Sequence, residues 1–196
     1  MEVEETKYLV LVNPWNKYPD NIDFNIIDVN SKYAENRFAE ENTFKAFLKL
    51  KEYALENGFD IEIESGYRSV EHQQRVFDNC ANQKGIEYAK KYVAIPGYSE
   101  HHTGLALDIC LKQYDKFIIE HNLPDDFKNF LKENVYKFGF IIRYPKSKEE
   151  ITGYNYEPWH IRYVGNIAEY IDKHNLTLEE YLDMFKNYHE TRNLKV

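Results

Sequence analysis

The stretch 105–111 constrains the fold most, because it places a carboxylate inside an apolar strand. Large aliphatic residues alternate there with smaller or polar ones, and this period of two predicts a half-buried β-strand. Asp108 lies in the middle of the stretch. Burying a lone carboxylate costs roughly several kcal/mol, so a cation, a metal ion or several hydrogen-bond donors are expected close to it.

Two histidines could complete a metal site with Asp108. His101 lies in the loop that follows Pro96, and His160 comes much later in the chain. Two imidazoles, one carboxylate and an open position holding water match a catalytic zinc site, whereas structural zinc sites are usually closed by four protein ligands. Glu157, three residues before His160, would then be the base that takes a proton from the water.

The residues alone leave simpler explanations open for the first half of this site. His102 competes with His101, and either could be an ordinary loop histidine. Asp108 could simply pair with an arginine such as Arg143 or Arg162. The alternation of the strand does not choose between the two histidines, so only a longer motif could separate them.

The second half of the site has equally simple explanations. His160, between a tryptophan and an isoleucine, could be a core histidine bonded to backbone. Glu157, before a proline, would usually be a surface carboxylate. The combination of two histidines, an aspartate and a nearby glutamate in loop and strand contexts nevertheless favours a metal site over these separate readings.

Length and charge bound the class of protein. The chain has 196 residues, 43% of them hydrophobic and 30% charged, so residues 1–196 are expected to form a single globular domain. The net charge of −8 provides no cationic surface, and nucleic acid or an anionic membrane is therefore not expected as a partner. A substrate carboxylate would have to be met by one or two local cations.

The sequence gives little information on compartment. Residues 8–12 are too short for the apolar segment of a signal peptide or for a membrane span. The expected location is cytoplasmic if Met1 is the native start, and the cell envelope if a targeting segment was removed. Cys80 and Cys110 belong to no CxxC pair and are expected to be buried free thiols.

The remaining pattern predicts helices interspersed among short strands. Strands are expected at residues 8–12, 61–64, 140–144 and 159–164, and an extended loop at 19–36. Helices are expected at residues 43–56, after the N-cap Ser69, at 86–93, from Pro124 to Gly139, and after a capping box of Thr177 and Glu180. This order predicts an α+β fold, with helices packed on a small antiparallel sheet that carries the zinc site.

Two of these elements come with expectations about burial. In the helix at residues 43–56, the buried side is expected to hold Phe44, Phe47, Leu48, Ala54 and Leu55. The strand at residues 61–64 alternates isoleucine with glutamate and is expected to have one solvated face.

Two motifs carry a resemblance to a known family. They are Ser99-x-His101-x-x-Gly104-x-Ala106-x-Asp108 and Glu157-Pro158-Trp159-His160-x-Arg162-Tyr163-Val164-Gly165. Together they resemble the VanY-type zinc D-alanyl-D-alanine carboxypeptidases and their VanXY and L,D-carboxypeptidase relatives. Further motifs in matching order are Ser65-Gly66-Tyr67-Arg68-Ser69 with Gln73, Val93-Ala94-x-Pro96-Gly97, and Gly139-Phe140-x-x-Arg143-Tyr144-Pro145. The resemblance spans roughly residues 60–166, the motif-bearing core.

The resemblance implies a zinc ion held by His101, Asp108 and His160, with Glu157 as general base. Zinc lowers the pKa of its bound water to about 7, so that hydroxide is available near neutral pH. Glu157 would accept the proton of that water and pass it to the leaving amine.

The resemblance also implies roles for residues around the metal. Arg68 would stabilise the developing oxyanion or hold the substrate. Ser99, Gln73 and Tyr67 would contact the substrate. Because an exopeptidase must recognise a free C-terminus, Ser99 and an arginine are the candidates for binding the terminal carboxylate.

The leading hypothesis is therefore a zinc carboxypeptidase that removes the terminal D-Ala from peptidoglycan stem peptides or their precursors. The alternatives within enzymes are an L,D-carboxypeptidase acting on tetrapeptide stems and a VanXY-like enzyme that also splits the free dipeptide. From other classes, the chain could be a catalytically silent zinc-binding module, or a partner-binding domain with a core histidine–aspartate cluster and no metal. Retention of Glu157 speaks against the silent module.

Overall fold

The computed structural model describes residues 7–19, 21–30, 37–114 and 116–193. The strands are β1 (Ile26–Asp28), β2 (Phe38–Glu40), β3 (Asp60–Ser65), β4 (Ala106–Gln113), β5 (Lys116–Ile118), β6 (Phe140–Tyr144) and β7 (Glu157–Tyr163). The helices are α2 (Glu41–Glu56), α3 (Val70–Lys84), α4 (Ile86–Tyr92), α5 (Asp125–Asn134), α6 (Glu149–Thr152), α7 (Ala168–Lys173) and α8 (Leu178–Asn193). Short 3₁₀ turns span Lys7–Leu9, Glu100–Thr103, Glu120–Asn122, Val135–Phe138 and Gly165–Ile167.

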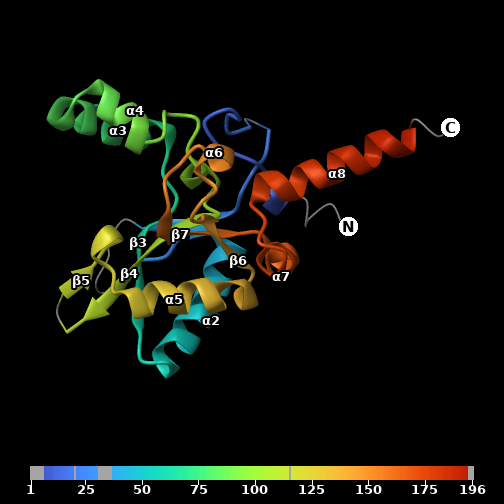
Figure 1. Ribbon diagram of the computed structural model, residues 1–196. Helices are drawn as coiled ribbons and strands as arrows, with labels where there is room; N and C mark the ends of the chain where they lie inside the picture. Colours follow the sequence, from blue (N-terminus) through green and yellow to red (C-terminus); the bar gives the residue numbers. More distant parts are fainter. Residues whose placement is uncertain (1–6, 20, 31–36, 115, 194–196) are drawn as a thin grey trace.

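The central sheet is antiparallel, which confirms the predicted α+β class. Its strand order is β3-β4-β7-β6, and the short strand β5 pairs with the far end of β4. Strands β1 and β2 form a separate antiparallel pair. Figure 1 shows α2 and α5 below this sheet, α3 and α4 standing away from it on the opposite side, and α8 projecting outward.

One face of the sheet forms the main hydrophobic core with α2 and α5. Leu107 and Ile109 of β4 and Trp159 and Ile161 of β7 all belong to this core, together with Phe127 of α5. Because side chains alternate along a strand, the residues between them point to the other face. The alternation that identified β4 in the sequence thus separates an apolar face from a polar one.

The polar face is aligned by the register of β4 and β7. In this antiparallel pair Asp108 lies directly opposite His160, and Ala106 lies opposite Arg162. Directly opposed residues have Cβ atoms about 5 Å apart, so the register alone brings a carboxylate and an imidazole together. The loop that precedes β4 then needs to supply only one more group.

Residues 8–12 do not form the predicted strand. Residues Lys7–Leu9 form a 3₁₀ turn and the next three are irregular. The reason lies in Arg162, whose Nη2 donates to the carbonyl oxygens of Tyr8, at 3.0 Å, and Val10, at 2.7 Å. Backbone groups that would pair with a neighbouring strand are satisfied by a buried guanidinium instead.

Residues 19–36 are not loop throughout, although positions 20 and 31–36 lie outside the described residues. Strand β1 occupies Ile26–Asp28 and pairs with β2, so that Ile26 lies opposite Glu40. A three-residue strand is too short to show a period of two, and its partner lies beyond the segment. The same brevity explains why β5 was not predicted.

Two expectations about burial were wrong. Leu48 and Leu55 are 48% and 61% exposed, because the buried stripe of α2 runs through Phe47, Leu50 and Ala54 and these two leucines lie outside it. Glu62 does not face solvent: it is only 7% exposed, and its carboxylate pairs with Lys51 of α2. The strand at 61–64 therefore has no solvated glutamate at this position.

The predicted helix ends are largely confirmed. Ser69 caps α3 by accepting a hydrogen bond from the backbone N–H of His72 at 3.1 Å. Thr177 and Glu180 form the predicted reciprocal capping box before α8. Helix α2 begins two residues earlier than expected, because the carboxylate of Glu40 serves as its N-cap. None of the described helices is both long and apolar enough to cross a membrane.

Gly104 provides a test of how the 3₁₀ turn Glu100–Thr103 joins β4. Its φ is +69°, and a Cβ atom there would lie 2.8 Å from the backbone nitrogen of Glu40 and 2.5 Å from Ile26 Cδ1. We expect Gly104→Ala to lower the free energy of unfolding by about 3 kcal/mol, through left-handed strain and steric overlap together. Chemical denaturation measures this directly.

Gly58→Ala is the matched control. Gly58 also has a positive φ, +89°, but no atom lies within 4 Å of the position of its Cβ. Strain alone should cost about 1 kcal/mol there. Equal decreases in the free energy of unfolding of the two variants would show that the close approach at Gly104 does not affect stability.

Candidate metal centre and active site

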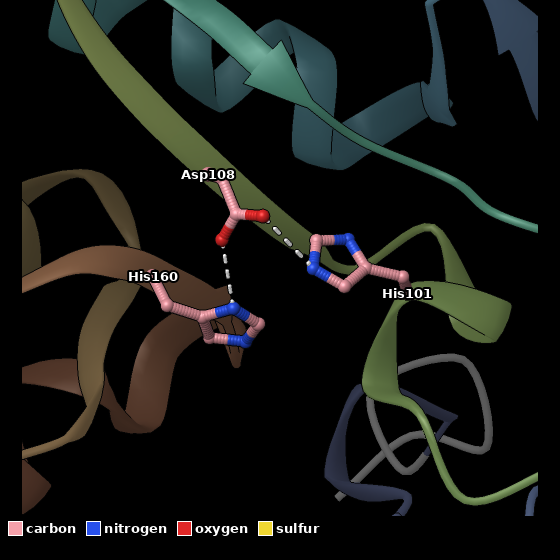
Figure 2. A group of neighbouring side chains, drawn as sticks. All are labelled: His101, Asp108 and His160. Atoms are coloured by element: carbon pink, nitrogen blue, oxygen red, sulfur yellow. Dashed lines mark hydrogen bonds and ion pairs between the residues drawn. The ribbon is translucent and has the colours of Figure 1, made fainter. Parts of the chain in front are cut away.

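Three side chains from separate elements meet on the polar face of the sheet. His101 comes from the 3₁₀ turn Glu100–Thr103, Asp108 from β4 and His160 from β7, and Figure 2 shows the carboxylate between the two rings. His101 Nε2 lies 3.2 Å from Asp108 Oδ2, and His160 Nδ1 lies 2.9 Å from Asp108 Oδ1. One ligand atom from each residue lies within 4.8 Å of the others. The arrangement can hold one metal ion.

The donor atoms of this cluster fit a cation. His101 Nδ1 lies 2.7 Å from the carbonyl oxygen of Gly66, which only an N–H at Nδ1 can satisfy. The neutral ring then presents a lone pair at Nε2 to a carboxylate oxygen of Asp108 only 3.2 Å away. Two facing lone pairs repel each other unless a cation lies between them, so the geometry suits a metal ion.

The structure separates His101 from its competitor His102. Both ring nitrogens of His102 are engaged by backbone: Nδ1 with the carbonyl of Arg68 at 2.6 Å, and Nε2 with the N–H of Gly97 at 3.0 Å. His102 therefore connects two loops and has no lone pair left for a metal. Its sequence neighbour His101, by contrast, belongs to the cluster that could hold a metal ion.

Asp108 does not pair with an arginine. Arg143 and Arg162 both donate to Glu100 instead, at 2.7 and 2.6 Å. Burial alone would raise the pKa of Asp108, but the protonated ring of His160, 2.9 Å away, holds that pKa below the ordinary value. The carboxylate is thus ionised and available as a ligand.

The two histidines are in different electrostatic environments. Burial lowers the pKa of His101. Burial would lower the pKa of His160 too, but its contacts with Asp108 and Glu100 raise that pKa to about 9. Without a metal, His160 is therefore protonated at neutral pH, and metal binding must displace a proton from this ring.

A cavity of about 360 Å³ opens onto the three ligands. Glu157, at the start of β7, lines it and is mostly shielded from solvent. Burial raises the pKa of Glu157 to about 7. It is therefore not the surface carboxylate of the simpler reading, and it is poised to exchange a proton near neutral pH.

Arg68 enters the cavity from the turn after β3 and is held in place by two side chains. Its Nη1 donates to Gln73 Oε1 and its Nη2 to Ser65 Oγ, both at 2.8 Å. Gln73 in turn donates to the carbonyl of Ala94 at 2.7 Å. The amide of Gln73 is thus engaged on both sides, and its contact in this structure is with the arginine.

Of the remaining predicted substrate contacts, Ser99 lines the cavity and Tyr67 does not. Ser99 is buried and lines the cavity. Tyr67 is not among the described residues that line it; its backbone N–H donates to the carbonyl of Phe38 at 2.6 Å. The substrate contacts assigned to Ser99 and Tyr67 remain predictions. Cys80 and Cys110 are both free thiols as expected, but only Cys110 is buried, because Cys80 lies partly exposed on the cavity wall.

Several lining residues were not found from the sequence. Tyr144 stacks on His160 with ring centroids 4.7 Å apart, and it lies within a quoted motif that could have pointed to it. Helices α3 and α4 supply a wall of which the motifs marked only Gln73. The members of this helical wall are Gln73, Val76, Cys80, Lys84, Tyr88 and Tyr92.

Comparison with known proteins decides the family. The family model described as VanY, D-alanyl-D-alanine carboxypeptidase, matches residues 36–166. The chain belongs to the VanY family. Membership of this family makes the chain a peptidase of the carboxypeptidase type.

Two curated VanY relatives are close in sequence. The protein YodJ of Bacillus subtilis is 41% identical over 185 residues, which cover 91% of this chain and 68% of that protein. The bifunctional D-Ala-D-Ala dipeptidase and carboxypeptidase VanXYC of Enterococcus gallinarum is 42% identical over 127 residues, covering 63% of this chain and 67% of that protein.

Solved VanY structures share the fold. A D,D-pentapeptidase VanY in complex with Zn(II) has a TM-score of 0.79 at 34% identity, covering 90% of this chain and 99% of that one. VanYB in complex with D-alanine-D-alanine gives the same score and identity, covering 90% and 97%. The L,D-carboxypeptidase LdcB has a TM-score of 0.78 at 37% identity, covering 92% and 88%.

The raised pKa of Glu157 makes a prediction about the metal-free protein. Between pH 4.5 and about 7 the folded state keeps a proton on Glu157 that the unfolded state has lost, so this carboxyl makes the protein less stable as pH rises. Glu157→Gln, which stays neutral, should therefore increase the free energy of unfolding above pH 7 by up to about 3 kcal/mol.

The measurement is denaturant unfolding of both proteins in chelator from pH 4 to 8. Below about pH 4.5 the carboxyl is protonated in both states, and the two curves should converge. A difference that does not change with pH would mean that burial does not shift this group.

Proposed function

We propose that this chain is a zinc-dependent D,D-carboxypeptidase that hydrolyses the C-terminal D-Ala-D-Ala bond of peptidoglycan stem peptides or their precursors. The observation that carries the proposal is the convergence of His101, Asp108 and His160 with a half-buried Glu157 in the lining of one cavity. The VanY relatives, one solved with Zn(II) and another with D-alanine-D-alanine, support the same ion and the same substrate class.

Three donor atoms of this chain would hold the zinc ion: His101 Nε2, an oxygen of Asp108 and His160 Nδ1. Two nitrogens and one oxygen, with a position left for solvent, are the donor set of a catalytic zinc site. When bound, zinc supplies Lewis-acid chemistry, lowering the pKa of water to about 7 and polarising the scissile carbonyl.

Glu157 would act as the general base. It faces the same cavity as the ligands, and burial gives it a pKa of about 7, where a carboxylate can both accept and return a proton. It takes the proton from the attacking water and delivers it to the amine of the departing D-Ala. One side chain therefore serves both halves of the hydrolysis.

Arg68 would stabilise the negative charge that develops on the scissile carbonyl oxygen. Its guanidinium is fixed by Gln73 and Ser65 before any substrate arrives, and such preorganisation is what makes charge stabilisation effective. Ser99, buried in the same cavity, together with an arginine is the candidate for binding the terminal carboxylate. Among the described lining residues Lys84 adds a second permanent cation.

L,D-carboxypeptidase activity on tetrapeptide stems is the second candidate. The observation that favours it is the similarity to LdcB, which matches the VanY structures in score and slightly exceeds them in identity. A VanXY-like activity on the free dipeptide is supported by the similarity to VanXYC. The zinc site is expected to be the same in all three cases, so only the choice of substrate separates them.

Side-by-side turnover tests this proposal. Zinc-loaded protein should release D-Ala from a pentapeptide ending in D-Ala-D-Ala faster than from the tetrapeptide stem or the free dipeptide.

Glu157→Ala should reduce release by at least about 10³-fold while zinc, measured by elemental analysis, stays stoichiometric. Release by the variant at the parental rate would refute the general-base role, and a faster tetrapeptide reaction would favour the L,D activity. A parent protein that does not bind stoichiometric zinc would instead favour a domain without metal.

Arg68→Lys tests the oxyanion role. Lysine keeps the charge but cannot donate to Gln73 and Ser65 at once while pointing into the cavity. We expect kcat to fall about 10²-fold to 10³-fold with zinc content unchanged. Arg75→Lys is the matched control, because Arg75 is exposed on the same helix as Gln73 and is outside the cavity lining, so its kcat should equal that of the parent.

A further inference from the structure

Glu100 has one carboxylate oxygen that the buried arginines do not use. Arg143 Nε and Arg162 Nη1 both donate to Oε1, at 2.7 and 2.6 Å. Oε2 is buried and has no hydrogen-bond partner among the described residues. It lies 3.5 Å from Nε2 of His160, which is likewise buried and otherwise without a partner.

The chemistry of imidazole gives this pair of atoms a role. A neutral ring carries one hydrogen, and if Nδ1 of His160 offers its lone pair to a metal ion, the hydrogen must be on Nε2. The acceptor facing that hydrogen is Oε2 of Glu100. An acceptor that bonds the other ring N–H of a metal-ligating histidine fixes the tautomer and orientation of the ring and strengthens it as a ligand.

From this geometry we infer that Glu100 is a positioning residue, which holds the ring of His160 so that Nδ1 faces the metal. The inference rests on the zinc site proposed above and extends it. Glu100 lies in the same 3₁₀ turn as His101. One turn of the chain therefore supplies one ligand directly and orients the other.

Glu100 is itself held rigidly. Arg143 also donates to both oxygens of Glu179, at 2.9 and 2.6 Å, and Glu179 accepts a further hydrogen bond from Asn13 at 3.0 Å. The carboxylate of Glu100 is thus fixed by two guanidiniums, one of which is itself held by Glu179.

The rival explanation is that Glu100 only compensates the charge of two buried arginines. Glu179 does this as well, since it pairs with Arg143 in the same network, but the contacts of its two oxygens are with Arg143 and Asn13 and not with His160. A comparison of Glu100→Gln with Glu179→Gln therefore separates orientation of the ligand from charge compensation. Both variants remove one buried negative charge and should lower stability.

The decisive measurement is zinc affinity by chelator competition at fixed pH. In Glu100→Gln the arginines hold the amide oxygen, so the amide N–H₂ faces the N–H of His160, and zinc should bind about 10-fold to 100-fold more weakly. In Glu179→Gln the affinity should stay within about 3-fold of the parent. Parental affinity in Glu100→Gln, or equal losses in both variants, would overturn the inference.

A second measurement uses the parent protein and does not depend on whether the variant folds. In zinc-loaded protein labelled with ¹⁵N-histidine, NMR should show the hydrogen of His160 on Nε2, protected from exchange with water. A hydrogen on Nδ1, or one that exchanges freely, would overturn the inference while leaving the zinc site intact. A parent protein that binds no zinc would instead refute the proposed function, and this inference with it.

Discussion

The pairing of Asp108 with His160 across two antiparallel strands is the constraint on which the rest of the site depends. The register of β4 and β7 makes these residues direct neighbours on one face, while the residues beside them build the core on the other. A single strand pair therefore couples the stability of the fold to the geometry of the metal site. The turn before β4 adds His101, which the carbonyl of Gly66 orients, and its neighbour Glu100.

Around this pair, buried charges are arranged in two layers. The inner layer contains the aspartate and the two histidines, and the outer layer contains Glu100, Arg143, Arg162 and Glu179. Removing one partner from such a network leaves an uncompensated charge, which is far costlier than losing a surface ion pair. The site is consequently rigid before substrate binds, as electrostatic catalysis requires.

Much of this site could be predicted because its signals are local. The alternation around Asp108, the spacing of Glu157 and His160, and the helix caps are each contained within a few consecutive residues. The predictions of a strand at residues 8–12 and of a loop throughout residues 19–36 failed because the partners are distant in sequence. The carbonyls of Tyr8 and Val10 accept from Arg162, and β1 pairs with β2, which lies beyond residue 36. The role of Glu100 was hidden for the same reason, since both its arginine partners come from other strands.

The helical wall of α3 and α4 stands apart from the sheet, as Figure 1 shows, although it borders the same cavity as the metal ligands. The packing of α2 and α5 against the opposite face does not involve it. Apart from Gln73, which holds Arg68, the named side chains of this wall belong neither to the His101, Asp108 and His160 cluster nor to the main core. The cavity is thus bounded on one side by a layer that shares the main core and on the other by a layer that does not.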